Sequence, residues 1–175
     1  MKNETFRVIK WFWAWEDYKE EAWLREMSRT GWHLNNTNFP TVYTFVRGEP
    51  LDYVYRLDFI TSGKKERAEY YQLFQDAGWE HISQMSGWQY FRKPPRSGEE
   101  PEIYTDNESK VEKYRRVLYF FLLMTAVLAP MYISVFNHDS SRYPTFVQGL
   151  YGFLAIFYAF AIIKLIQRIN QLRRK

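Results

Sequence analysis

The stretch AWLREMSRTGW at residues 22–32 returns as EYYQLFQDAGW at residues 69–79, 47 residues further along the chain. Apolar side chains recur in both stretches at the i, i+3, i+4 spacing of an amphipathic helix, and both end in a Gly-Trp pair. Glycine at that position favours a left-handed helix C-cap, which releases the chain into a strand. The duplication therefore predicts two similar helices, each followed directly by a strand.

Strand-like runs surround both helices in the same order. One precedes each helix and two follow it, at residues 6–13, 32–36 and 42–47 in the first copy and 53–60, 79–84 and 88–92 in the second. The unit strand, helix, strand, strand thus occurs twice within residues 1–95. Two such units predict an α+β fold, a ferredoxin-like sandwich or a close relative, with both helices on one face of an antiparallel or mixed sheet.

The charge of the 175-residue chain, +4 in total, is unevenly divided. Residues 1–95 hold 13 basic and 13 acidic side chains, so this region is neutral. Residues 96–109 are acidic and rich in Pro, Ser and Glu, which predicts a linker. The chain has no cysteine, which excludes a disulfide scaffold, thiolate metal sites and a cysteine nucleophile.

Two long apolar runs lie in the third region, residues 110–175. Residues 117–136 and 146–163 contain no Asp, Glu, Lys, Arg or His and are each long enough to cross a bilayer as a helix, so we expect a transmembrane hairpin with helices at about 117–136 and 146–166. Basic residues flank the far ends of both runs, and the connecting loop holds a single Arg. The positive-inside rule then predicts a cell-membrane protein with both termini cytoplasmic. The alternative is a buried hairpin within a soluble protein.

Catalytic motifs are scarce. The glycines form neither a dinucleotide-binding nor a P-loop pattern, and no serine lies in a nucleophile elbow. Acidic pairs at residues 16–17 and 20–21 are interpreted as complementing the dipole of the first helix. His33 and His81 could bind a metal together with Asp58 or Glu80, but solvent-facing strand histidines are the favoured explanation. We therefore expect a non-catalytic protein without a cofactor or metal.

The aromatic strands are the unusual feature. Trp11, Trp13 and Trp15 alternate along one predicted strand and Tyr53 and Tyr55 along another, with apolar bulk on both faces. An aromatic face left open beneath a one-sided helix layer would be a binding surface, for a protein or for a small hydrophobic or cationic ligand. Ordinary core packing and a single-stranded nucleic-acid platform are the alternatives, and the neutral charge of the domain argues against nucleic acid. The expected binding residues are Trp11, Trp13, Tyr53, Tyr55, Arg56, Asp58, Trp88 and Tyr90.

Three aromatic-rich phrases carry a resemblance to a known family. They are KWFWAWEDYKEEAWLREMSRTGWHL, YTFVRGEPLDYVYRLDF and LFQDAGWEHISQMSGWQYFRKP, within residues 6–95. Together they resemble the bacterial membrane family catalogued as domain of unknown function 2812. The resemblance implies a C-terminal pair of membrane helices and a gene often encoded beside a PadR-like transcriptional regulator. It implies no activity and no catalytic residues.

These observations predict a membrane-anchored sensing or docking module. The expected partners are the lipid bilayer, a protein such as a PadR-like regulator or a small ligand, and a second copy of the chain, with no direct contact to nucleic acid. The alternative is a small membrane transport or resistance component that acts through an oligomer of hairpins, although neither apolar run holds the ionisable residue that an ion path usually shows. A membrane enzyme is the third possibility.

Overall fold

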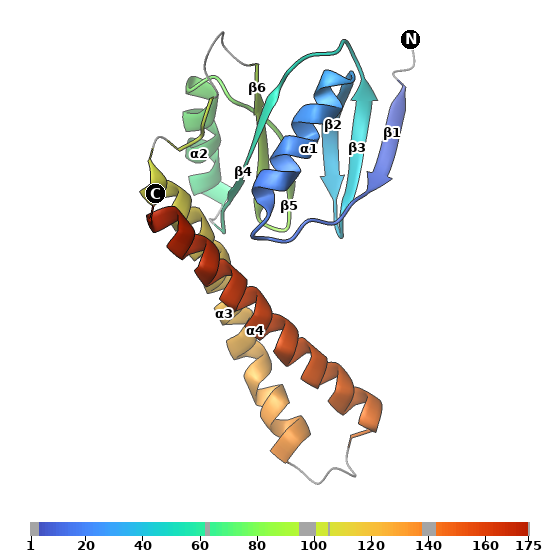
Figure 1. Cartoon of the computed structure of the whole chain (residues 1–175), viewed down its shortest axis with the longest axis vertical. Coiled ribbons are helices and arrows are strands. Elements are labelled where there is room, and N and C mark those ends of the chain that lie inside the picture. Colours follow the sequence, from blue (N-terminus) through green and yellow to red (C-terminus); the bar gives the residue numbers. More distant parts are fainter. Residues whose placement is uncertain (1–3, 62–63, 95–100, 105, 138–142, 175) are drawn as a thin grey trace. The chain divides into compact units, whose positions relative to one another are not determined.

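The computed structural model describes the chain except for residues 1–3, 62–63, 95–100, 105, 138–142 and 175 (Figure 1). It divides into two compact units, Met1–Asp106 and Asn107–Lys175. The first unit, which we call the head, holds all the strands and two helices. The second, which we call the hairpin, consists of two long helices.

The head confirms the predicted duplication. Each copy forms its own three-stranded antiparallel sheet, with the order β1-β3-β2 in the first and β4-β6-β5 in the second. The third strand of each copy lies between the other two, so the helix links the two outer strands. The elements are β1 (Thr5–Ile9), α1 (Asp17–Arg29), β2 (Trp32–Asn38), β3 (Val42–Arg47), β4 (Val54–Phe59), α2 (Lys64–Asp76), β5 (Glu80–Met85) and β6 (Trp88–Lys93).

The duplication extends to details of the backbone. Gly31 and Gly78 follow the two helices with φ angles of +84° and +81°, as the predicted C-caps require. β2 carries a bulge between Leu34 and Asn36, and β5 carries one between His81 and Ser83, again 47 residues apart. The two copies therefore share their irregularities as well as their strands.

The core shows where the predicted layering is wrong. Leu24 of α1 packs with residues of both sheets, in a cluster that contains Leu34, Tyr43, Phe45, Tyr55, Leu57 and Tyr90. Phe74 of α2 packs with Val54 and Phe91, which lie on the other face of the second sheet. The two helices thus cover opposite faces of the second sheet, because Val54 of β4 and Phe91 of β6 give the face toward α2 an apolar contact of its own. The α+β class holds, but the strands form two sheets instead of one.

The two sheets meet where β2 approaches β5. The backbone N–H of Thr37 donates to the Ser83 hydroxyl at 2.9 Å, and the Ser83 hydroxyl donates to the side-chain oxygen of Asn36 at 3.0 Å. Asn36 and Ser83 occupy equivalent bulge positions in the two copies. A side chain thus satisfies a backbone donor at the junction.

The hairpin consists of α3 (Asn107–Asn137) and α4 (Thr145–Arg173), which pack against each other. Both are long and apolar enough to cross a membrane. Both helices are longer than the predicted 117–136 and 146–166. Charged residues continue α3 at its N-terminal end and α4 at its C-terminal end. Pro130 lies inside α3.

The predicted linker, residues 96–109, is shorter in the structure than expected. Residues 95–100 lie outside the described part of the chain, but Glu102 pairs with Arg56 at 3.0 Å and Ile103 packs against the cluster around Phe74. α3 then begins at Asn107. The segment around Glu102 therefore belongs to the head, because a charge and an apolar side chain anchor it there.

Candidate functional site

The tryptophans after β1 do not alternate along a strand as predicted, because β1 ends at Ile9. They stack on one another in the connection to α1. The rings of Trp13 and Trp15 are nearly parallel, with centroids 5.3 Å apart, and Trp11 meets Trp13 edge-on at 5.4 Å. Trp15 is buried, Trp13 is half-buried and Trp11 is 59% exposed. Of the three, only Trp11 has most of its surface open to a partner.

The predicted tyrosines lie in the core. Tyr55 and Tyr90 are fully buried in the cluster around Leu24, and the Tyr55 hydroxyl accepts the backbone N–H of Leu34 at 3.3 Å. Tyr53 and Trp88 are partly buried against the same cluster. Ordinary core packing, one of the alternatives derived from the sequence, therefore describes these residues. They do not form an open aromatic face.

Arg56 and Asp58 lie on the opposite face of β4 from Tyr55. Asp58 is buried and accepts the hydroxyl of Tyr70 on α2 at 2.7 Å. Arg56 reaches Glu102 and also lies 3.6 Å from Glu21. Both charges are thus engaged in fixing neighbouring segments of the head.

An exposed apolar surface lies instead at one end of the first sheet. Ile9 is 76% exposed at the end of β1, and Phe39 is 79% exposed in the turn between β2 and β3. The backbone N–H of Lys10 donates to the carbonyl of Thr41 at 3.2 Å, which holds this turn beside the start of the tryptophan segment. We call Ile9, Trp11 and Phe39 the aromatic tip. Strand periodicity did not indicate it, because two of its residues lie in loops.

A buried carboxylate links the two copies of the repeat. Glu20 of α1 accepts the hydroxyl of Tyr43 from the first sheet and that of Tyr90 from the second, both at 2.7 Å. Burial raises the pKa of Glu20 from 4.5 to about 7, a shift that the two hydrogen bonds oppose and the nearby charge of Asp17 increases. The interpretation of Glu20 as a partner of the helix dipole is therefore incomplete. Its spacing of four residues from Leu24 was the signal that it faces the core.

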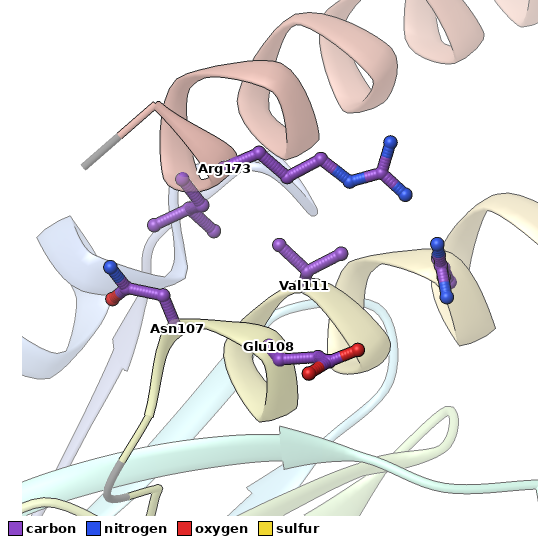
Figure 2. Close-up of a pocket in the computed structure, with 6 residues that line it drawn as sticks. Asn107, Glu108, Val111 and Arg173 are labelled. Atoms are coloured by element: carbon purple, nitrogen blue, oxygen red, sulfur yellow. The ribbon is translucent and has the colours of Figure 1, made fainter.

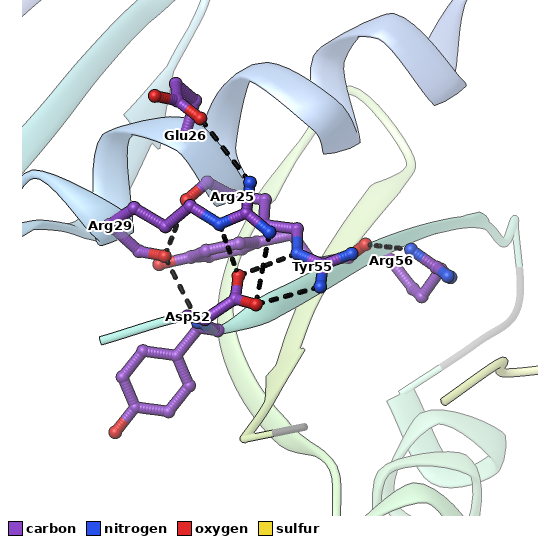
Figure 3. A network of polar contacts seen from close by, with 8 residues as sticks. Arg25, Glu26, Arg29, Asp52, Tyr55 and Arg56 are labelled. Carbon is purple, nitrogen blue, oxygen red and sulfur yellow. Dashed lines mark hydrogen bonds and ion pairs between the residues drawn. The ribbon is translucent and has the colours of Figure 1, made fainter. Parts of the chain in front are cut away.

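Two arginines and one aspartate form a second polar cluster, at the end of α1 (Figure 3). Arg25 and Arg29 each donate two hydrogen bonds to Asp52, between 2.7 and 3.1 Å, and these bonds lower the pKa of Asp52. Asp52 precedes β4, so the cluster ties α1 to the entry of the second repeat. Because the charges are already paired, the cluster fits a structural role.

The histidines have separate partners. The Nε2 atom of His33 lies 2.8 Å from the carbonyl oxygen of Glu49. The Nε2 atom of His81 lies 3.1 Å from Gln89, and burial lowers the pKa of His81. Glu80 pairs with Arg92 at 2.7 Å. Within the described part of the chain, no three His, Asp or Glu residues come together as a metal site would need.

Comparison with known proteins places the chain in a family. Residues 16–126 match the family described as protein of unknown function (DUF2812). The matched region leaves out β1 and runs from the start of α1 through the remaining elements of both repeats and into α3. No curated protein and no solved structure matches. Because the match covers more than half of the residues, the chain belongs to the DUF2812 family.

Proposed function

We propose that the chain is a non-catalytic, membrane-anchored docking module whose head binds a protein partner through the aromatic tip. The observation that carries the proposal is the exposure of Ile9, Trp11 and Phe39 together at one end of the first sheet. Burial of large exposed apolar side chains against a partner removes them from water, which stabilises the complex. Tryptophan in particular is a frequent anchor of protein interfaces.

The hairpin supports the anchoring half of the proposal. Its two apolar helices are long enough to hold the head at a bilayer, and their basic ends favour the cytoplasmic leaflet. A head held there would concentrate a cytoplasmic partner at the membrane. The PadR-like regulator that the family resemblance suggests is the first partner to test.

The transport alternative has less support. α3 and α4 enclose a groove of about 380 Å³, lined by Thr125, Leu128, Ala129, Tyr132, Ile133, Ala155, Tyr158, Ala159 and Ile162. The lining is almost entirely apolar and contains no charged residue. An ion or proton path usually includes an ionisable side chain. The groove therefore does not favour transport over docking.

Binding of a purified PadR-like regulator to the full-length chain in detergent tests the docking proposal. Trp11→Ser combined with Phe39→Ser should weaken binding by about tenfold or more, because it removes the apolar anchors. Leu73→Ser is the matched control, since Leu73 is 67% exposed but lies on α2, away from the tip in the chain. Failure of the wild-type chain to bind the regulator, or equal effects of the tip and control substitutions, would contradict the proposal.

A further inference from the structure

The basic end of the hairpin contains a pocket that neither the family nor the docking proposal explains. Eight basic and two acidic residues lie at this end of the hairpin, namely Lys110, Lys113, Arg115, Arg116, Lys164, Arg168, Arg173 and Arg174 against Glu108 and Glu112. The pocket opens between the first three turns of α3 and the last turn of α4, with a volume of about 250 Å³ (Figure 2). It is lined by Asn107, Glu108, Val111, Arg115, Leu172 and Arg173.

The charges around the pocket favour an anion. Arg173 forms no ion pair with any other residue that the structure describes, and in Figure 2 its side chain extends across from Val111. Arg115 gives one N–H to Glu112 at 3.2 Å, which leaves further donors on its guanidinium. Glu108, on the α3 side, supplies the one carboxylate of the lining. Glu112 and Glu108 balance the two guanidinium groups, but the eight basic and two acidic residues at this end of the hairpin leave a net charge of +6 around the pocket.

The class of anion follows from the guanidinium groups and from their place in the chain. Arginine presents a planar set of donors that matches the oxygens of a phosphate, often with two parallel bonds. Arg115 lies two residues, about 3 Å along a helix axis, before the uncharged run that starts at Val117. A hairpin inserted in a bilayer would therefore hold Arg115 close to the depth of the lipid phosphates.

The apolar part of the lining fits a lipid better than a free ion. Val111 and Leu172 face the pocket beside the arginines, so a ligand with a phosphate and an adjoining apolar part would satisfy both. Basic pockets between membrane helices on the cytoplasmic side bind anionic headgroups in this manner. We propose that this pocket binds the phosphate group of an anionic lipid headgroup.

Lipid retention by the full-length chain tests the assignment. The detergent-purified protein is mixed with equal amounts of phosphatidylglycerol and phosphatidylcholine, and the bound lipid is counted by native mass spectrometry. We expect wild type to retain phosphatidylglycerol preferentially. Arg115→Gln combined with Arg173→Gln should reduce that preference by about tenfold, because it removes charge-assisted hydrogen bonds from the pocket. Far-UV circular dichroism verifies that the variant is folded.

A matched variant separates a pocket from diffuse attraction. Lys110→Gln combined with Arg174→Gln removes the same charge from the same end of the hairpin but leaves the lining intact. It should keep the preference within about twofold of wild type, the effect of long-range charge alone. Equal loss in both double variants, or no loss in the pocket variant, would overturn the proposal. If millimolar inorganic phosphate displaced phosphatidylglycerol, the pocket would be a site for free phosphate and the proposal of a lipid ligand would be wrong.

Discussion

Glu20 shows how one side chain can join the two copies of the repeat. Its carboxylate lies on the apolar side of α1 and holds a tyrosine hydroxyl from each sheet. A carboxylate in this position is more easily buried when it is protonated, and this is why its pKa is raised. The stability of the head should therefore depend on pH through Glu20.

The sign of the dependence follows from the raised pKa. The folded head binds the Glu20 proton more tightly than the unfolded chain does, so its contribution to stability is present below pH 4.5 and is lost as the pH rises through about 7. We expect the free energy of unfolding of wild type to fall by up to about 3 kcal/mol between pH 4.5 and 8, relative to Glu20→Gln. Urea denaturation of the full chain in detergent measures this difference.

Tryptophan fluorescence reports on the head alone in that experiment, because all seven tryptophans lie within residues 1–95. Glu26→Gln is the control, since Glu26 lies on the exposed side of the same helix. Its pH profile should follow that of wild type. A wild-type profile that runs parallel to that of Glu20→Gln would show that Glu20 does not titrate in this range.

Some roles of single residues could be predicted from the sequence and others could not. The glycine C-caps at Gly31 and Gly78 follow from local backbone geometry, and the structure confirms them. The environments of Tyr55 and Tyr90 depend on which face α1 covers, a property of the assembled head that local periodicity does not contain. The exposure of Phe39 likewise depends on the turn between β2 and β3.

At the scale of elements, the order strand, helix, strand, strand is local information and was predicted correctly. The contact between strands of the two copies is not local. β2 and β5 are brought together by a serine, an asparagine and a threonine at two bulges, where no hydrophobic pattern marks the contact. For this reason the sequence predicted one sheet, where the structure has two.

Ser83→Ala tests the importance of that junction. The substitution removes the acceptor of the buried Thr37 N–H, and an unsatisfied buried donor costs about 1–3 kcal/mol. We expect the free energy of unfolding of the head to fall by this amount, measured by urea denaturation followed by tryptophan fluorescence. Gln84→Ala, at an exposed neighbouring position on β5, should change it by less than about 0.5 kcal/mol. If the two variants had equal stability, the junction would carry no energetic weight.

At the scale of the whole molecule, the arrangement in the membrane remains a prediction, and the absence of cysteine makes it directly testable. Gln72→Cys places a single thiol on exposed α2, and Thr145→Cys places one at the exposed start of α4. Because basic residues flank the other ends of both helices, we expect Thr145→Cys to face outside. A membrane-impermeant maleimide added to intact cells should label Thr145→Cys and spare Gln72→Cys.

Gln72→Cys should become labelled once the cells are permeabilised, which verifies that its thiol is reactive. Labelling of Gln72→Cys in intact cells would reverse the orientation. Labelling of both positions only after permeabilisation would mean that the helices do not cross the membrane. The second outcome would also remove the lipid site proposed at Arg115 and Arg173.

The position of α1 against both sheets has a consequence for how the protein is made. Neither half of the head has a complete hydrophobic interior, because the cluster around Leu24 draws its members from both. When only the first fifty residues have left the ribosome, the apolar side chains of the first sheet and α1 remain exposed, because the second sheet has not yet been synthesised. Damage in either half should therefore unfold both, and two separately synthesised halves ought to become stable only when they are mixed.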